Sequence, residues 1–549
     1  MIFKTLILAE LFLLLFSRTA NMAVPDTEGP DQYFYRVYFA DKGDAAISEF
    51  NPQHMLSPAA LERRAKCGAE MPAFTDLPVN PDYIEAVRQT GLKWRLSSKW
   101  MNTALFMSET PFDTDKITIL PFVRRVALVK APAGKRAKRG DKFGFENDFL
   151  PSSIFRPIEP VNGMPLLLSG YNGKGVTVAV FDAGFLYANI IESLEPLRNR
   201  GGIITTQDFV GNSSNVYAFH GHGTAVLSIL AGSLGNIITG TAQGADYMLF
   251  RTEDDASEYP VEEDYWAAAA EYADSAGADI ISSSLGYSWF DDPAMNYSFS
   301  NTDGNTAFIT VAADIAASKG ILVVSSAGNE RNNEWQRILF PSDGDSVMSI
   351  GALNPNLTIS TFSSAGFSAD GRVKPDVVAP GVSIPLQYTY GQWQAGSGTS
   401  FSCPVISGMC ASLMQASPGA TAEDIRKAVR LSSNRINNPD SLYGYGLPNF
   451  VKSLKILEDI HAFKPKVTVT AGPNPFVDEI YLWFRDVPER LAVTVTDNSG
   501  KTVLKTEYRT FIGRSFTLTG MSSAARGVYL VKVETAAGEK VFKMIKLGQ

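Results

Sequence analysis

Apolar and polar positions divide the chain into three parts with different periodicities. The first part has three strand-like runs and one helical pattern: 33–39, 102–107, 123–129 and 81–90. The second part, from 151 to 460, alternates strand cores at 176–181, 279–281 and 321–324 with helical stretches at 224–231, 262–276 and 307–319. Strands that alternate with helices are typical of a parallel sheet covered on both faces. We therefore expect a small α+β unit followed by an α/β domain.

The helical patterns stop near residue 465. Seven short strand-like runs follow, separated by Gly, Asn, Asp and Pro: 467–470, 480–484, 492–496, 502–508, 515–518, 528–533 and 540–546. Short strands with frequent turn residues favour a small all-β sandwich at this end.

The first 23 residues have the order of a secretory signal peptide. Lys4 precedes the apolar run 5–16, and small residues follow near Ala23. The run contains Glu10 and is shorter than the roughly 20 residues of a membrane span. An uncleaved anchor is the alternative, but export is favoured, with no transmembrane segment after signal cleavage.

Composition limits the classes of protein. The 549 residues are 45% hydrophobic and 19% charged, which excludes a fibrous or disordered chain, and the net charge of −8 offers no basic footprint for nucleic acid. Three cysteines exclude a disulfide scaffold. Cys403 and Cys410 would lie roughly 10 Å apart along one helix, too far for a disulfide, so we expect buried thiols.

The polar stretch from Lys130 to Asp148 has the composition of a linker. It carries a basic run made of Lys135, Arg136, Lys138, Arg139 and Lys142. A solvated loop and a proteolytic processing site both explain this run, and the two readings are compatible.

Three residues of the α/β part have the types found in a nucleophilic hydrolase. Asp182 follows the strand 176–181, His222 opens an apolar helix, and Ser400 lies in a glycine-rich turn that leads into a helix of small residues. A serine hydroxyl is a weak nucleophile until an imidazole accepts its proton, and the imidazole needs a carboxylate to hold its tautomer. Asp182, His222 and Ser400 are therefore a candidate catalytic triad.

The same region offers two donors for an oxyanion. Ser400, at a helix N-terminus, presents its own backbone N–H, and Asn329, just past the strand 321–324, presents a side-chain amide. We expect Pro404 to lie in the first turn of that helix, where its missing N–H has no consequence.

The order Asp, His, Ser is the order of subtilisin, and Ser402 replaces the second glycine of the Gly-x-Ser-x-Gly motif of lipases. Residues 160–455 resemble a subtilisin-like serine protease (subtilase, peptidase S8 family). The matching motifs are Phe181-Asp182-Ala183-Gly184, His222-Gly223-Thr224-Ala225-Val226, Ser326-Ala327-Gly328-Asn329, Lys374–Gly381 and Gly398–Pro404. Ala183 stands where the family usually has Ser or Thr, and Ala225 where a second His is common.

The resemblance implies a three-layer parallel-sheet catalytic domain and a substrate cleft. It implies that Ser284, Leu285 and Gly286 pair with the substrate backbone, and that they form, with Ser326, Ala327 and Gly328, the walls of the pocket for the residue before the scissile bond. An ordinary loop is the alternative reading of these segments. We expect no cofactor for the chemistry; the family often carries structural calcium, but no spacing here identifies a metal site.

Other polar residues are weaker candidates for a catalytic or substrate-binding role. The acidic stretch formed by Glu253, Asp254, Asp255, Glu258, Glu262, Glu263 and Asp264 favours a solvated face, with a pocket for basic residues as the alternative. His54, His220 and His461 are interpreted as non-catalytic.

The flanking parts resemble accessories of an exported protease. Residues 24–150 resemble a subtilase prosegment with its processing linker. Residues 465–549 resemble the C-terminal sorting domain of the Bacteroidetes type IX secretion system, through Gly472-Pro473-Asn474-Pro475, Gly527–Val531 and Lys540–Lys546. A carbohydrate-binding or adhesive sandwich is the alternative.

We therefore expect a secreted serine endopeptidase, made as a zymogen, that acts on proteins or peptides. Its parts are a signal peptide (1–23), a propeptide and linker (24–150), a catalytic domain (151–460) and a sorting domain (465–549) that engages the secretion machinery. The mature protein is expected outside the cell or on its outer surface, after passage through the periplasm. The rival hypothesis is a catalytically silent cell-surface binding protein, which would have no chemical need for the intact set of four residues.

Overall fold

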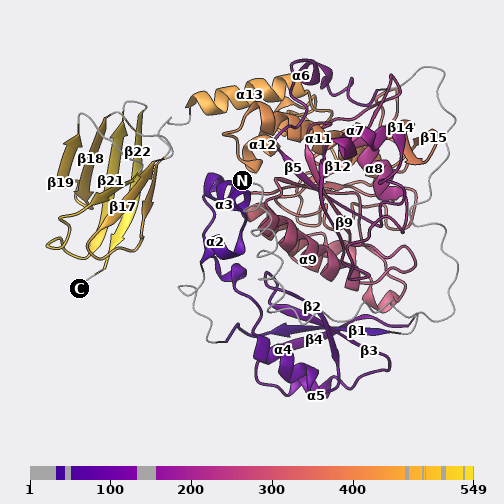
Figure 1. Cartoon of the computed structure of the whole chain (residues 1–549), viewed down its shortest axis with the longest axis horizontal. Helices are drawn as coiled ribbons and strands as arrows, with labels where there is room; N and C mark the ends of the chain where they lie inside the picture. The colour runs from indigo at the N-terminus through magenta and orange to yellow at the C-terminus, as the bar shows by residue number, and fades with distance from the viewer. Residues whose placement is uncertain are drawn as a thin grey trace. The chain divides into compact units, whose positions relative to one another are not determined.

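A computed structural model describes residues 32–43, 51–132, 156–463, 469–484, 488, 490–508, 515–535 and 538–547. The described residues up to Leu457 form one compact unit, and those from Glu458 onward form a second (Figure 1). The expected signal peptide and the basic run from Lys135 to Lys142 lie outside the described residues.

The N-terminal part of the first unit is an antiparallel sheet with the strand order β2-β3-β1-β4. Its elements are β1 (Tyr33–Phe39), α2 (Pro52–Met55), α3 (Pro58–Cys67), η2 (Phe74–Asp76), α4 (Pro81–Arg88), β2 (Lys93–Ser98), β3 (Thr103–Ser108), α5 (Asp115–Thr118) and β4 (Val123–Lys130). Side chains alternate between the faces of a strand. In β1, Tyr35 and Val37 therefore pack in the core of this sheet, whereas Phe34 packs with Val261 and Tyr265 of the following part.

The central part is built on a seven-stranded parallel sheet with the order β13-β12-β11-β10-β5-β9-β6. Its strands are β5 (Thr177–Asp182), β6 (Ile203–Asp208), β9 (Asp246–Arg251), β10 (Ile280–Ser283), β11 (Leu322–Ser326), β12 (Met348–Leu353) and β13 (Val377–Pro380). The short pairs β7 (Ser233–Leu234) with β8 (Ile238–Thr239), and β14 (Ile384–Thr389) with β15 (Gln392–Gly396), lie outside this sheet.

Helices cover both faces of this sheet. The helices and helical turns of this part are α6 (Met164–Leu168), η3 (Glu192–Leu194), α7 (Glu195–Asn199), α8 (His222–Ala231), α9 (Val261–Ala276), η4 (Pro293–Met295), η5 (Phe299–Asn301), α10 (Phe308–Ser318), α11 (Thr399–Ala416), α12 (Ala422–Ser432) and α13 (Phe450–Phe463). Val178 and Val180 of β5 pack in a core with α8 and α11, while Ala179 and Phe181 pack in a second core with α9 and α10. The expected three-layer α/β architecture is confirmed.

Helix α11 runs through the first of these cores. Cys403 and Cys410 are buried on it as free thiols, as the spacing argument requires. Burial raises the pKa of the Cys403 thiol to about 12, so this thiol stays protonated and unreactive. None of the helices in the described ranges, α11 included, combines the length and the apolar character needed to cross a membrane.

The second unit contains two antiparallel sheets, with the strand orders β16-β17-β20 and β19-β18-β21-β22. The strands are β16 (Val469–Gly472), β17 (Ile480–Phe484), β18 (Leu491–Asp497), β19 (Thr502–Tyr508), β20 (Ser515–Leu518), β21 (Gly527–Thr535) and β22 (Gly538–Lys546). In β17, Ile480 and Leu482 are buried and Tyr481 and Trp483 are exposed, which is the alternation of a strand with one core face. One apolar cluster joins residues of both sheets, so the expected β-sandwich is confirmed.

Buried carboxylates of α9 meet the N-terminal sheet. Asp264 accepts two hydrogen bonds from Arg36 Nε, at 2.8 and 2.9 Å, and one from Arg36 Nη2 at 2.6 Å. About two turns further along the helix, Glu271 accepts hydrogen bonds from Ser98 Oγ at 2.6 Å and Trp100 N at 3.0 Å. Burial raises the pKa of Glu263, beside Arg36, to about 7. This face of α9 is therefore matched in charge and hydrogen bonding by the N-terminal part.

A second contact lies at the C-terminal end of α9. Asp274 accepts hydrogen bonds from Arg63 and Arg64 of α3, and Arg64 also binds Asp76 at 2.8 Å. Lys319 Nζ also donates to Asp76, at 2.9 Å from Oδ1. The side chains of all five residues are buried, so each charge depends on its partners for stabilisation.

We predict that Asp274→Ala lowers the free energy of unfolding of the first unit by about 3–5 kcal/mol, because two buried guanidinium groups lose their shared carboxylate. Urea-induced unfolding of the full chain, in a Ser400→Ala background, measures this loss. Glu85→Ala is the control, since it removes one partner of the exposed ion pair with Arg88. Equal unfolding midpoints for the two variants would contradict the prediction.

Candidate active site

Three neighbouring strands bring the candidate residues to one edge of the parallel sheet. β5 ends at Asp182, β10 ends one residue before Ser284, and β11 ends three residues before Asn329. The sheet order β11-β10-β5 makes these strands adjacent and parallel, so their carboxyl ends share one edge. This edge is where ligands bind in open α/β sheets.

Asp182 and His222 form a buried pair. His222, the first residue of α8, places Nδ1 2.8 Å from Asp182 Oδ1, which also accepts the N–H of Ala183 at 2.8 Å. The exposed fractions of Asp182 and His222 are 0% and 3%. A carboxylate on Nδ1 holds the proton there and directs Nε2 outward as a base.

Gly223 permits this close approach. A Cβ atom at residue 223 would lie 2.5 Å from the carbonyl oxygen of Gly184 and 2.8 Å from Asp182 Cβ, closer than any side chain allows. The Gly223 N–H instead donates to the Gly184 carbonyl at 3.1 Å. His220 also has a structural contact, because its Nδ1 accepts the His222 N–H at 3.1 Å.

Ser400 is the second residue of α11, in the first turn, whose backbone N–H groups have no acceptor within the helix. Its Oγ donates to the carbonyl of Ser284 at 3.2 Å, and Ser284 Oγ donates to the carbonyl of Ser400 at 2.9 Å. Two reciprocal hydrogen bonds therefore connect the segment after β10 to the candidate nucleophile.

The expectation that Pro404 lies in the first turn of its helix is wrong. Pro404 is the sixth residue of α11, beyond the first turn, where an ordinary residue would donate its N–H to the carbonyl of Ser400. Proline has no N–H, so that carbonyl is left for the hydroxyl of Ser284. The helix thus gives up one internal hydrogen bond at the point where Ser284 contacts it.

Asn329 is exposed and is oriented by Thr399, a residue that the sequence reasoning missed although it adjoins Ser400. Asn329 Oδ1 accepts hydrogen bonds from both the N–H and the hydroxyl of Thr399, each at 2.9 Å. The amide nitrogen is therefore on the other side of the group. A Cβ atom at Gly398 would lie 3.5 Å from Asn329 Nδ2 and 3.7 Å from Ser400 N, so both nitrogen atoms lie within 4 Å of one point beside Gly398.

The two predicted wall segments lie beside these residues. Ser284 and Leu285 are buried and Gly286 is partly exposed, directly after β10. Ser326, Ala327 and Gly328 are buried at the end of β11, and the Gly328 N–H donates to Thr399 Oγ1 at 3.2 Å. Both segments are thus held against the first turn of α11.

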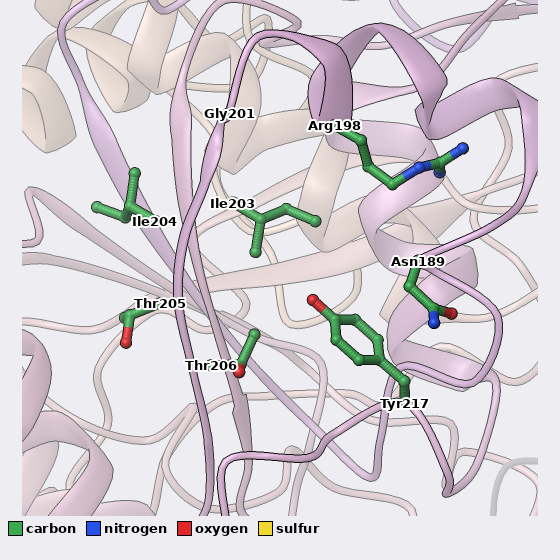
Figure 2. Close-up of a pocket in the computed structure, with 8 residues that line it drawn as sticks. All are labelled: Asn189, Arg198, Gly201, Ile203, Ile204, Thr205, Thr206 and Tyr217. Carbon is green, nitrogen blue, oxygen red and sulfur yellow. The ribbon is translucent and has the colours of Figure 1, made fainter.

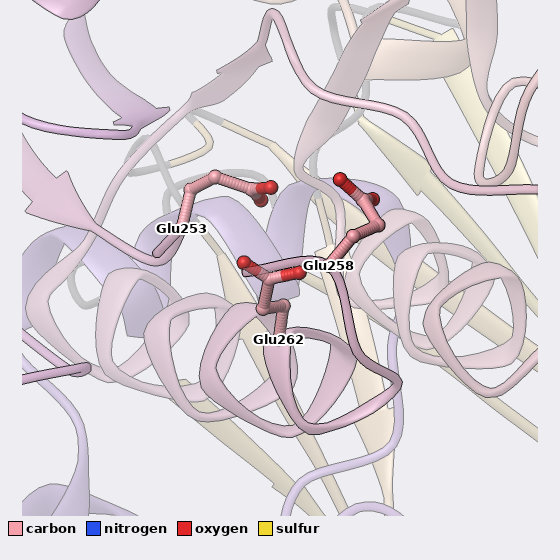
Figure 3. Close-up of side chains that lie close together, drawn as sticks. All are labelled: Glu253, Glu258 and Glu262. Atoms are coloured by element: carbon pink, nitrogen blue, oxygen red, sulfur yellow. The ribbon is translucent and has the colours of Figure 1, made fainter. Parts of the chain in front are cut away.

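The expected solvated face is wrong for most of the acidic stretch. Glu253, Glu262, Glu263 and Asp264 are buried. Carboxylate oxygens of Glu253, Glu258 and Glu262 lie within 4.8 Å of one another (Figure 3).

Local hydrogen bonds hold two of these three carboxylates in place. Glu262 accepts the N–H groups of Asp254 at 2.9 Å and Tyr259 at 3.2 Å, and Glu253 accepts the hydroxyl of Tyr287. Lys130, at the end of β4, lies 3.4 Å from Asp254 Oδ2. These contacts explain why carboxylates are buried here.

A separate hollow of about 360 Å³ lies along the edge strand β6 (Figure 2). Its lining residues are Asn189, Arg198, Gly201, Ile203, Ile204, Thr205, Thr206 and Tyr217. Arg198 is engaged by the carbonyl groups of Ala188 and Ile191, at 3.1 and 2.8 Å. This hollow includes none of the predicted site residues.

Comparison with protein families assigns three segments of the chain. Residues 173–446 match the model of the subtilase family, and residues 34–142 match the peptidase S8 propeptide domain of Bacteroidota. Residues 472–547 match the secretion system C-terminal sorting domain, which confirms the expected sorting domain and export of the chain.

Two subtilisins agree with the match to the subtilase family. Subtilisin E of Bacillus subtilis (strain 168) is 31% identical over 297 residues, which are 53% of this chain and 69% of that protein. Subtilisin DY of Bacillus licheniformis is 30% identical over 299 residues, which are 52% of this chain and 96% of that protein. A solved structure of the prenylagaramide maturation protease PagA covers 54% of this chain and 98% of its own, at 21% identity and a TM-score of 0.43. The chain belongs to the subtilase family and is a serine endopeptidase with an N-terminal propeptide domain and a C-terminal secretion sorting domain.

Proposed function

We propose that Ser400, His222 and Asp182 hydrolyse peptide bonds through an acyl-enzyme. The observation that carries this proposal is the buried 2.8 Å hydrogen bond between Asp182 and His222 at the sheet edge that also holds Ser400. The hydroxyl of Ser400 attacks the peptide carbonyl, and its proton passes to His222 Nε2. His222 then protonates the leaving amine, and a water molecule deprotonated by His222 hydrolyses the ester.

The first step requires a side-chain rotation of Ser400. In the structure its hydroxyl donates to the Ser284 carbonyl, which is an acceptor but not a base. Rotation about the Cα–Cβ bond of Ser400 redirects the hydroxyl to the imidazole when substrate binds. Apo geometries of this kind are common, because catalytic hydrogen bonds tighten in the complex.

The two donors beside Gly398 stabilise the oxyanion in this proposal. Asn329 Nδ2 and Ser400 N both lie close to one point beside Gly398, which supports a shared site for the oxyanion. Protein side chains and backbone then supply the base, the acid and the oxyanion donors, and we propose that the chemistry needs no cofactor.

We further propose that the chain is made as a zymogen. The match of residues 34–142 to a propeptide domain and the basic linker after Lys130 support this proposal. The propeptide covers α9 through buried ion pairs, and cleavage of the linker converts it into a separate chain. Proteins or peptides are the proposed substrates, and the secretion machinery is the proposed partner of the sorting domain.

A fluorophosphonate probe tests the nucleophile. We expect the processed wild-type protein to be labelled on Ser400 and the Ser400→Ala variant to stay unlabelled, because the probe reacts only with an activated serine. Mass spectrometry of the labelled peptide identifies the site. A processed wild-type protein that the probe does not label would favour the silent binding protein instead.

Asn329→Ala tests the oxyanion site. We expect kcat to fall by about 10²- to 10³-fold with a small change in KM, a range established on a subtilisin, because the donor acts mainly in the transition state. Steady-state kinetics on a peptide anilide measure both constants. Asn332→Ala, at an exposed position on the same loop, is the matched control. An equal kcat for the two variants would remove Asn329 from the site.

Conversion of the precursor tests the zymogen. We expect wild-type chains to lose the N-terminal part by cleavage between about Lys130 and Asp148, and Ser400→Ala chains to retain it. N-terminal sequencing of the purified proteins locates the cut. Full activity of an unprocessed wild-type chain, or identical processing of Ser400→Ala, would count against autocatalytic activation.

A further inference from the structure

The two wall segments flank the site where a substrate carbonyl would bind. Ser284 contacts Ser400 through two hydrogen bonds, and Gly328 contacts Thr399 and precedes Asn329. The side chain of the residue before the scissile bond is attached next to the carbonyl carbon. In the proposed mechanism it therefore lies between the segment of Gly286 and the segment of Gly328.

One side chain already occupies the space between these two glycines. A Cβ atom at Gly286 would lie 2.7 Å from Leu339 Cβ and 2.9 Å from Leu339 Cδ1. A Cβ atom at Gly328 would lie 2.6 Å from Leu339 Cγ and 2.8 Å from Leu339 Cδ1. Leu339 therefore touches the bare faces of both glycines, and its exposed fraction is only 9%.

Backbone hydrogen bonds hold Leu339 in this place. Its N–H donates to the carbonyl of Ala327 at 3.0 Å, within one wall segment. The next residue, Phe340, exchanges two hydrogen bonds with Tyr287, next to the other segment, at 3.0 and 3.1 Å. Leu339 also belongs to the apolar core that contains Leu285. The backbone of Leu339 is thus fixed between the two walls, and its side chain is restricted by packing in this core.

We propose that Leu339 restricts the residue before the scissile bond to glycine, alanine and other small side chains. This inference rests on the proposed function, because it uses the position of the acyl group on Ser400. A phenylalanine or leucine at this substrate position overlaps the leucine side chain. Hydrogen and methyl side chains extend least toward Leu339, so they overlap it least.

Kinetics on tetrapeptide p-nitroanilides that differ only in the residue before the anilide test the proposal. We expect wild-type kcat/KM to be highest for Ala and lower for Phe by at least about 100-fold, because single methylene groups already change discrimination by about 10- to 200-fold. In Leu339→Ala, removal of three carbon atoms opens the pocket, and the Phe/Ala ratio of kcat/KM rises by at least about 100-fold. Leu339→Val, which keeps more of the core packing, shifts the ratio in the same direction by about tenfold.

The control is Ile309→Ala, a buried residue of α10 in the same apolar core as Leu339. It weakens the core without opening the space between the glycines, so its Phe/Ala ratio stays at the wild-type value. Wild-type protein that the fluorophosphonate labels but that cleaves Phe and Ala peptides equally would overturn the role of Leu339 alone. Ratios unchanged in both Leu339 variants would do the same. Protein that is neither labelled nor active on any peptide would overturn the proposed function and this inference together.

Discussion

The hydrogen bond between Asp182 and His222 constrains much of the central unit. A carboxylate that is fully buried needs partners, and Asp182 Oδ1 finds two in the imidazole and the Ala183 amide. For the imidazole to arrive, α8 must begin almost in contact with the turn after β5, which only a glycine at 223 allows. The apolar residues of α8 then pack on the same face of the sheet as α11, the helix that presents Ser400. The position of the base and the packing of the core are therefore consequences of one arrangement.

The N-terminal part satisfies a second set of charges. Glu271 and Asp274 on α9 are buried only because Ser98, Arg63 and neighbouring groups of the N-terminal part cover them. A buried ion pair contributes little net stability over an apolar contact, but either partner left alone is costly. Removal of the whole propeptide instead returns both partners to water, where each is solvated. Such an interface stabilises the bound propeptide as long as all ion pairs are formed. It imposes no unpaired buried charge on the catalytic part once the whole propeptide is released, as expected for a domain that is removed after processing.

The sequence predicted most of this site because its chemistry is local to strand ends and helix starts. Asp182, His222 and Ser400 each adjoin an apolar run whose periodicity identifies the element, so the sheet topology places them without further information. The acidic stretch was misjudged for two reasons. Asp264 and Glu263 are paired with Arg36, more than two hundred positions away in the sequence. Glu253 is covered by Tyr287 of a later segment, so neither partner belongs to the local pattern. Pro404 was misplaced within its helix because the hydroxyl that replaces its hydrogen bond belongs to Ser284, which no local pattern connects to it.

The proposed catalytic group and the proposed specificity pocket depend on different kinds of contact. Ala183 stands where the family usually has Ser or Thr, and Asp182 Oδ2 is buried without a hydrogen-bond partner among the described residues. The pair with His222 nevertheless keeps its 2.8 Å geometry, since Oδ1 carries both contacts that orient the imidazole. The contact between Asp182 and His222 therefore does not require a partner for Asp182 Oδ2. The volume of the proposed pocket between Gly286 and Gly328, in contrast, depends on a single side chain, that of Leu339. Leu339 belongs to none of the sequence motifs. Its proposed role depends on contacts with Gly286 and Gly328 that only the three-dimensional structure shows.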